Sequence, residues 1–235
     1  MTIDSLANAL ISVNWSENVK TFLTAEDAVA KVDAACFRLA VWAKQLENVD
    51  AGNAAISFVR ALQISAHHSV ATTGLSIYKA AASSIRGIVE NALYYTYFRT
   101  HPAELASLVR EPKYYTSKSE ILDYHKLHTP GFRELQEKFG LLSRIEDWYS
   151  AISAIVHGQV PGVWVESVSL AETKPSPATL ALVVEKFCEA ERIVHELFLL
   201  TVGKERWDDF SHQAKKTLLS GMSGDIKTAL QLDKY

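Results

Sequence analysis

The sequence predicts an all-α protein that folds as an antiparallel helical bundle. Apolar residues recur at helical spacing along most of the 235 residues. The six prolines and ten glycines cluster between these periodic segments, so the connections are short, as between antiparallel neighbours in a bundle. With 48% hydrophobic residues the chain can build a core, and no linker of flexible composition divides it. We therefore expect a single all-α domain over residues 1–235.

Three long helices are predicted in the first hundred residues. Thr24 is expected to cap the first, with Asp27 three residues later in a pattern similar to a capping box. The second is expected from residue 53 to about residue 70. The third, residues 75–98, is apolar or small on almost every side, which indicates a central and mostly buried position.

Shorter helices and one irregular insert follow. Prolines separate the shorter helices, at Pro102, Pro112 and Pro130. A further helix is expected over residues 141–157. Residues 158–177 break the helical pattern, and their valines favour a short irregular or hairpin insert: Val163, Val165 and Val168.

The last long helix is expected to begin at Pro177 and to end near residue 200. The core bundle then covers about 25–202, and a polar helical tail follows over 203–235. This last long helix has more apolar residues than one buried stripe needs, which favours a homodimer. The surplus residues are Leu182, Val194, Phe198 and Val202.

Charge and composition exclude several classes of protein. The net charge of −3 provides no overall basic field that would attract nucleic acid or an anionic membrane. The two cysteines, Cys36 and Cys188, fit neither a zinc motif nor a disulfide framework. The N-terminal residues lack the pattern of a signal peptide, and no apolar run is long enough to span a membrane. We expect a cytoplasmic protein without a metal or a cofactor.

Two predicted helices carry polar residues that are expected to face each other. Tyr149, Ser153 and His157 form a row beside the apolar stripe of the 141–157 helix. Arg86 and Glu90 share a face of the apolar 75–98 helix, and Lys79 lies on that face too. Because a buried charge is costly unless it is paired, Arg86 and Glu90 need partners there. These residues form our candidate polar pocket.

A purely structural interpretation remains open. Arg86 and Glu90 are spaced as a simple i,i+4 ion pair. His157 followed by Gly158 suits the end of a helix, where glycine adopts the left-handed conformation and histidine interacts well with the helix dipole. Tyr149 and Ser153 would then only pack against neighbouring residues.

The pair R-x-x-x-E, here Arg86 and Glu90, followed by Y-x-x-x-S-x-x-x-H-G, here Tyr149 to Gly158, resembles bacterial HEPN-like helical-bundle proteins. The resemblance covers roughly residues 55–200. It implies an all-α bundle that is often dimeric, in a group with links to antiviral defence. In the active branch it implies metal-independent RNA cleavage, with Arg and His of an R-x4–6-H motif activating the 2′-hydroxyl.

This chain departs from the active-branch motif. Twelve residues separate Arg144 from His157, which is too many, and the one match is Arg60 to His67, with six residues between them. Those two share a helix face. A match of this kind is expected by chance in a sequence of this composition.

Other candidate residues lie between the longer helices. Lys113, Tyr114 and Tyr115 offer basic and aromatic groups for a nucleic-acid contact. His125 and His128 have the spacing of metal ligands, but we interpret them as exposed residues of a short polar helix. The chain contains no glycine-rich phosphate loop and no G-x-S-x-G motif.

Three functions remain open. The first is a ribonuclease effector or toxin, and the second is a non-catalytic binding or regulatory component, with a protein partner, of an antiviral defence or toxin–antitoxin system. The third is a nucleotide-binding or small-anion-binding module in which Arg86 holds the anion. The near-neutral charge and the missing motif favour the second and third.

Overall fold

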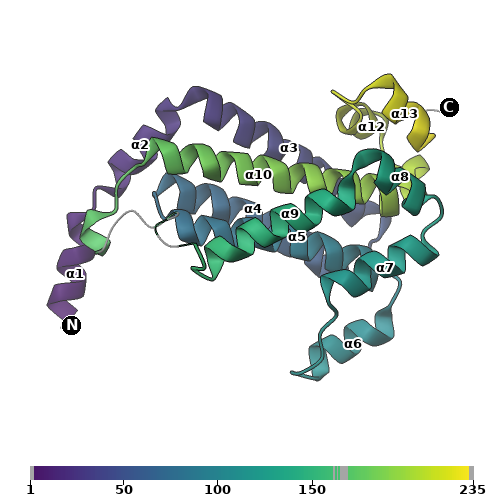
Figure 1. The fold of residues 1–235 in the computed structure, drawn as a ribbon, viewed down its shortest axis with the longest axis horizontal. Coiled ribbons are helices and arrows are strands. Elements are labelled where there is room, and N and C mark those ends of the chain that lie inside the picture. The colour runs from purple at the N-terminus through teal and green to yellow at the C-terminus, as the bar shows by residue number, and fades with distance from the viewer. Residues whose placement is uncertain (1–2, 161, 163, 165–168, 233–235) are drawn as a thin grey trace.

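A computed structural model describes residues 3–160, 162, 164 and 169–232 of the chain, and no strand occurs among them. This confirms the all-α fold (Figure 1). The helices up to the insert are α1 (Ile3–Ser12), α2 (Trp15–Thr24), α3 (Glu26–Val49), α4 (Ile56–Gly74), α5 (Tyr78–Phe98), α6 (Pro102–Arg110), α7 (Lys118–His128), α8 (Phe132–Phe139) and α9 (Leu141–Val156). Those after it are η1 (Leu170–Glu172), α10 (Pro177–Phe198), η2 (Leu199–Gly203), α11 (Lys204–Arg206), η3 (Trp207–Asp209), α12 (His212–Leu218) and α13 (Gly224–Leu230).

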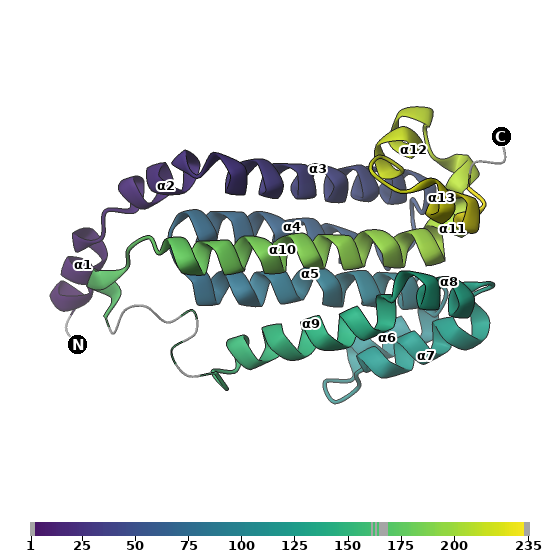
Figure 2. The same cartoon turned by 45° about the horizontal axis from the view of Figure 1, so that its top comes forward.

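Five long helices, α3, α4, α5, α9 and α10, lie side by side (Figures 1 and 2). Successive long helices run in opposite directions, as predicted. However, α10 packs between α3 and α5 and runs parallel to both, because all three are odd-numbered passes of the chain along the bundle. The order of the contacts shows this direction: Arg38 pairs with Glu191, and Trp42 bonds to His195 one turn further along both helices. The bundle is therefore not antiparallel throughout.

Helix α5 is the central helix, as its sequence predicts. It packs against α4, α9 and α10, and eleven of its residues are buried. Its small residues permit a close approach to α4: a Cβ atom added at Gly87 would lie 3.0 Å from Ser65 Oγ.

The predicted cap at Thr24 is wrong. Thr24 is the last residue of α2, and its hydroxyl donates a hydrogen bond to the Thr21 carbonyl at 2.8 Å. Helix α3 begins at Glu26, with Ala25 as its N-cap and no side-chain capping bond. The reason is that one residue, Ala25, both ends α2 and begins α3, so the chain turns without a separate capping residue.

The insert after α9 contains no strand among its described residues, and it includes the short 3₁₀ helix η1. Val163, Val165 and Val168, on which the hairpin alternative depends, lie outside the described residues. Gly158 follows α9 with φ of +68°, so it adopts the left-handed conformation that we predicted for the helix end.

Residues after 203 contribute to the core, although their composition predicts a polar tail. Helix α12 packs against α3, and the buried side chains of this segment join the main hydrophobic cluster. They include Trp207, Phe210, Leu218 and Leu230. These scattered apolar residues are close together only because the chain turns back at η2 and η3 over the end of the bundle (Figure 2).

The surplus apolar residues of α10 are used within the chain. Val194, Phe198 and Val202 are each at most 1% exposed, whereas Leu182 is 43% exposed. The observation on which we based a homodimer therefore reduces to Leu182, because α3, α5 and α9 surround α10. Within the described ranges, no helix combines the length and the apolar character needed to cross a membrane.

Candidate functional site

Arg86 on α5 is the centre of a polar cluster with residues of α9. Its Nε donates a hydrogen bond to Glu90 Oε1 at 2.9 Å, and Nη2 donates to the Tyr149 hydroxyl at 2.7 Å. Its Nη1 lies 3.0 Å from His157 Nε2. Because a guanidinium only donates, His157 Nε2 is the acceptor in this hydrogen bond. We call Arg86, Glu90, Tyr149 and His157 the Arg86 cluster.

Tyr149 joins the ion pair of α5 to α9. Its hydroxyl donates to Glu90 Oε1 at 2.6 Å, while the Arg86 guanidinium carbon lies 4.9 Å from the centre of its ring. The simple i,i+4 ion pair is therefore present, but it is part of a network between two helices. Because α5 and α9 run in opposite directions, Arg86 lies opposite His157, and Glu90 lies opposite Tyr149.

Partial burial sets the protonation of these groups. Burial disfavours the charged Arg86, but the Glu90 carboxylate and Tyr149 outweigh it and raise the pKa of Arg86. Burial, together with the Glu90 carboxylate, raises the pKa of Tyr149 to about 12. Tyr149 is therefore a neutral hydrogen-bond donor at physiological pH. The side chains of Arg86 and Glu90 remain 22% and 37% exposed, so solvent and ligands can reach the cluster.

Lys118 on α7 also contacts the cluster, and our sequence interpretation did not identify it. Its Nζ lies 4.9 Å from the centre of the Tyr149 ring and pairs with Glu146 of α9. The signal in the sequence is a capping box formed by Ser117 and Glu120, which fixes Lys118 as the first residue of α7. A small pocket of about 40 Å³ between Lys118, Tyr149 and Glu90 has room for little more than a water molecule.

Two further predicted residues lie on the α9 side. A Cβ atom added at Gly158 would lie 3.7 Å from Lys79 Nζ, so the exposed Lys79 ammonium reaches the C-terminal end of α9. The helix dipole favours a cation at that position. The hydroxyl of Ser153 is buried without a hydrogen-bond partner among the described residues. Ser153 therefore shares the helix with the cluster but not its hydrogen bonds.

The remaining candidates lie apart from the cluster. Lys113, Tyr114 and Tyr115 are in the connection between α6 and α7, and Tyr115 is 72% exposed. None of the three bonds to the Arg86 cluster in the part of the chain that the structure describes. Arg60 pairs with Glu47 at 2.9 Å, and no hydrogen bond joins it to the exposed His67.

The interpretation of His125 as an exposed residue is wrong. It is 2% exposed, and its two ring nitrogens bond to Thr129 Oγ1 at 2.8 Å and to Thr96 Oγ1 at 3.0 Å. Burial lowers the pKa of His125 to about 4, so the ring is neutral. His128 is exposed, and no group of three or more His, Cys, Asp or Glu side chains in the described ranges is arranged to hold a metal ion.

Comparison of the chain with protein-family profiles, with curated proteins and with solved structures gives no match. The chemistry of the Arg86 cluster must therefore be judged from its geometry. The cluster presents a guanidinium paired with one carboxylate, an imidazole and a neutral phenol, with Lys79 and Lys118 at its margins. Such groups suit recognition of a phosphate.

Proposed function

We infer that this protein is a HEPN-like helical binding component that holds a phosphate group, of RNA or of a nucleotide, at the Arg86 cluster. One observation carries the proposal. Three hydrogen bonds orient the Arg86 guanidinium, and these use three of its five N–H groups. The two N–H groups that remain suit a phosphate oxygen pair. The orientation is fixed before the ligand arrives, which reduces the entropic cost of binding.

The charges around Arg86 support an anion. Lys79 lacks an ion pair in the described part of the chain, and Lys118, which pairs with Glu146, also lies over the ring of Tyr149. The one carboxylate that bonds to Arg86 is Glu90, which the Tyr149 hydroxyl also contacts. Among the lysines at the margins of the cluster, Lys79 is therefore the ammonium without a carboxylate partner among the described residues.

We favour binding over catalysis for a geometric reason. A general base must have a free lone pair within reach of the proton that it removes. The Nε2 lone pair of His157 instead accepts a hydrogen bond from Arg86. In keeping with the resemblance, we place the protein as a homodimeric regulatory component of a bacterial antiviral defence or toxin–antitoxin system.

Metal-independent cleavage of RNA is the second candidate. The distance of 3.0 Å between His157 Nε2 and Arg86 Nη1 is the observation that favours it. A phosphate that draws Arg86 toward itself would release Nε2, which is then free to accept the proton of a 2′-hydroxyl. The guanidinium would stabilise the charge that develops on the phosphate.

The test is binding of a fluorescently labelled single-stranded RNA and of nucleoside phosphates, each measured in EDTA. We expect Arg86→Gln to weaken binding about tenfold, the loss of one charge-assisted contact. Arg60→Gln is the matched control, because Arg60 also pairs with one glutamate of the bundle but lies outside the cluster. Equal affinity of both variants and the wild-type protein would contradict the proposal.

The same samples distinguish binding from cleavage. Intact RNA after incubation supports the binding component. Cleavage that His157→Ala abolishes, and His67→Ala does not, supports the second candidate. Cleavage that depends on His67 would contradict both and would move the site to Arg60 and His67. Circular dichroism of each variant checks that it is folded.

A further inference from the structure

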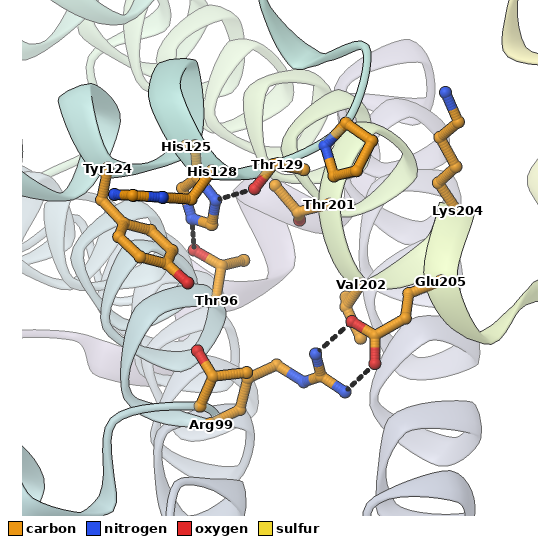
Figure 3. Close-up of a pocket in the computed structure, with 12 residues that line it drawn as sticks. Thr96, Arg99, Tyr124, His125, His128, Thr129, Thr201, Val202, Lys204 and Glu205 are labelled. Carbon is orange, nitrogen blue, oxygen red and sulfur yellow. Dashed lines mark hydrogen bonds and ion pairs between the residues drawn. The ribbon is translucent and has the colours of Figure 1, made fainter.

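A second pocket lies at the other end of α5, away from the Arg86 cluster. Arg99 caps this end and lies about 20 Å from Arg86 along the helix axis, at a rise of about 1.5 Å per residue. The pocket has a volume of about 360 Å³, within the range of small-molecule sites. Its walls come from the end of α5, from α7 and the turn after it, and from η2 and α11 (Figure 3).

One wall of the pocket is the π-helical turn η2, which continues α10. Such turns are rare and are frequent at functional sites. Here it depends on Gly203, where a Cβ atom would lie 2.7 Å from the Phe198 carbonyl oxygen and 2.9 Å from Trp42 Cη2. The wider turn places Thr201 and Val202 against the pocket, and Lys204 and Glu205 line it after this turn, with Glu205 directed at Arg99 and the Lys204 ammonium beside Gly131.

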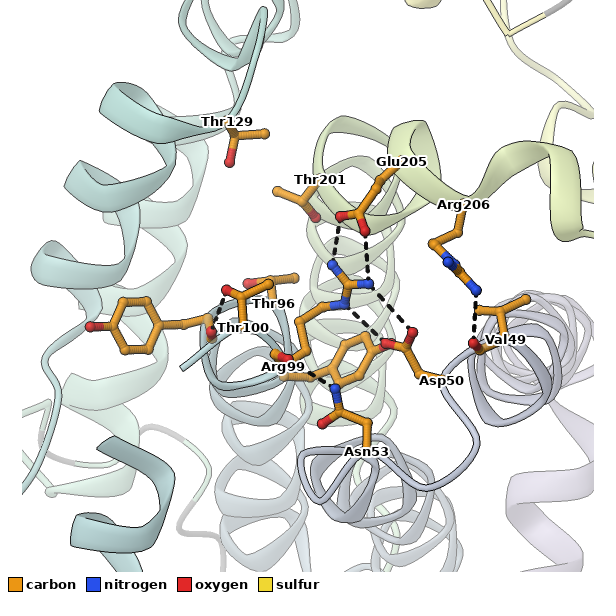
Figure 4. A network of polar contacts seen from close by, with 12 residues as sticks. Val49, Asp50, Asn53, Thr96, Arg99, Thr100, Thr129, Thr201, Glu205 and Arg206 are labelled. Carbon is orange, nitrogen blue, oxygen red and sulfur yellow. Dashed lines mark hydrogen bonds and ion pairs between the residues drawn. The ribbon is translucent and has the colours of Figure 1, made fainter. Parts of the chain in front are cut away.

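Arg99 is held from two sides at the base of the pocket (Figure 4). On the inner side it bonds to the buried Asp50, with 2.9 Å between Nε and Oδ2. On the outer side it forms a two-point contact with Glu205, at 2.6 Å and 3.2 Å. The Arg99 side chain is 9% exposed, whereas that of Glu205 is 57% exposed.

The two carboxylates therefore differ in what they can do. Asp50 also accepts a hydrogen bond from Tyr95 at 2.7 Å, so it is fixed inside the fold. Glu205 has no hydrogen-bond partner other than Arg99 in the described residues. Glu205 is the exposed one of the two carboxylates, so it is the one that an anion from solution can replace at Arg99. A carboxylate or phosphate of a ligand fits the same two-point geometry.

A second cation and an aromatic wall lie on either side of Arg99. The Lys204 ammonium has no ion pair in the described ranges, and it lies so close to Gly131 that a Cβ atom there would be 2.9 Å from Nζ. Across the pocket, the rings of Tyr124 and His128 have centroids 4.9 Å apart (Figure 3). The deeper His125 is held by Thr96 and Thr129, so this wall is fixed in place.

The geometry points to a binding site for a small organic anion that carries a planar ring. Its carboxylate or phosphate replaces Glu205 at Arg99 and contacts Lys204, and its ring lies against Tyr124 and His128. None of these residues belongs to the Arg86 cluster, so the site is independent of the function proposed above.

The test is isothermal titration calorimetry of the full chain with four probes: benzoate, phenyl phosphate, acetate and inorganic phosphate. We expect one ring-bearing probe to bind, and its acid group identifies the preferred anion. Its counterpart without a ring should bind about tenfold more weakly, since part of the contact is lost. Equal affinity with and without the ring, or no binding of any probe, would overturn the proposal.

Two substitutions with opposite expected effects on affinity locate the site. Lys204→Gln should weaken binding of the ring-bearing probe about tenfold, because it removes one charge-assisted contact. Glu205→Gln should strengthen binding, because it removes the competing carboxylate. Arg60→Gln is the control and should leave this affinity unchanged, because Arg60 pairs with Glu47 outside both sites. Weaker binding on Glu205→Gln, or no effect of Lys204→Gln, would contradict the proposed pose.

Discussion

Helix α5 carries two arginine clusters that differ in what holds them. Arg86 has a carboxylate on its own helix, and its other contacts come from a tyrosine and a histidine of α9. Arg99 has two carboxylates, Asp50 from the end of α3 and Glu205 from α11. Arg99 thus joins three parts of the chain that are far apart in sequence. The Arg86 side chain is more exposed than that of Arg99, and only one of its three partners is a carboxylate. Both features leave Arg86 available for a ligand.

The difference shows how the same residue type serves two purposes. A guanidinium between two carboxylates, such as Arg99, stabilises the fold through the buried Asp50 and can take an external anion only in exchange for the exposed Glu205. Arg86 and its one carboxylate, Glu90, have no net charge together, whereas Arg99 with Asp50 and Glu205 has a net charge of −1. The two arginines would therefore bind anions in different ways: Arg86 with N–H groups that it does not use within the fold, and Arg99 by exchange of one carboxylate for another anion.

The largest effect is expected at Arg99. Arg99→Ala leaves the buried Asp50 without its cation, and we expect the free energy of unfolding to fall by about 3–5 kcal/mol. Urea denaturation followed by circular dichroism measures this. Arg60→Ala is the control, with an expected loss of at most about 1 kcal/mol because its ion pair is exposed. Similar losses for both variants would show that Arg99 is not a structural residue.

Acid is expected to destabilise the fold through buried histidines. Burial lowers the pKa of His125 to about 4 and that of His195 to about 3. The pKa of a histidine in the unfolded chain is about 6.5. Below that pH the unfolded state takes up protons that the folded state does not. The histidines therefore do not reduce the free energy of unfolding above about pH 6.5. Below that pH the free energy of unfolding falls by about 1.4 kcal/mol per pH unit for each histidine, until the pH reaches the pKa of that histidine in the folded protein.

The variant His125→Gln tests the direction of this pH dependence. Between pH 6.5 and 5, the free energy of unfolding of the variant should depend on pH less steeply than that of the wild-type protein, by about 1.4 kcal/mol per unit. Urea titrations at four pH values measure both slopes. An unchanged slope would mean that His125 is protonated in the folded protein, and hence that its bonds to Thr96 and Thr129 differ from those described.

A smaller effect is expected at Arg86. Arg86→Ala removes three hydrogen bonds, but its exposure and that of Glu90 let water replace them, so we expect a loss of about 1–2 kcal/mol. Our sequence argument, which assumed a buried arginine, would give about 3–5 kcal/mol. Denaturant unfolding of both variants, Arg86→Ala and Arg99→Ala, shows which one loses more free energy of unfolding. A larger loss for Arg86 would reverse the roles that we assign to them.

Helical periodicity predicted most of the long helices and the contact between Arg86, Glu90, Tyr149 and His157. This succeeded because residues spaced by three or four along a helix share a face whatever the tertiary structure is. The Arg99 cluster could not be found in this way. Asp50 and Glu205 lie next to turns, and only the packing of α3 and α11 at one end of the bundle brings them together.

Packing also explains the other differences. The polar composition of residues 203–235 predicted a tail, yet Trp207 and Phe210 are in the core, because a few apolar residues suffice to fix a turning segment. His125 lies one helical turn after the buried Ile121 and Leu122, so periodicity is consistent with its burial, but the hydroxyls that satisfy it lie on α5 and in the turn after α7. Both cases needed contacts between distant segments, which local patterns do not contain.

The most direct test of phosphate binding at the Arg86 cluster is the salt dependence of RNA affinity. For a single-stranded RNA, log K should fall linearly with log salt concentration, by about 0.7 for each phosphate contacted. We predict that Arg86→Gln lowers the magnitude of this slope by about 0.7, and that Arg60→Gln leaves it unchanged. The same slope for Arg86→Gln and the wild-type protein would contradict a phosphate contact at Arg86.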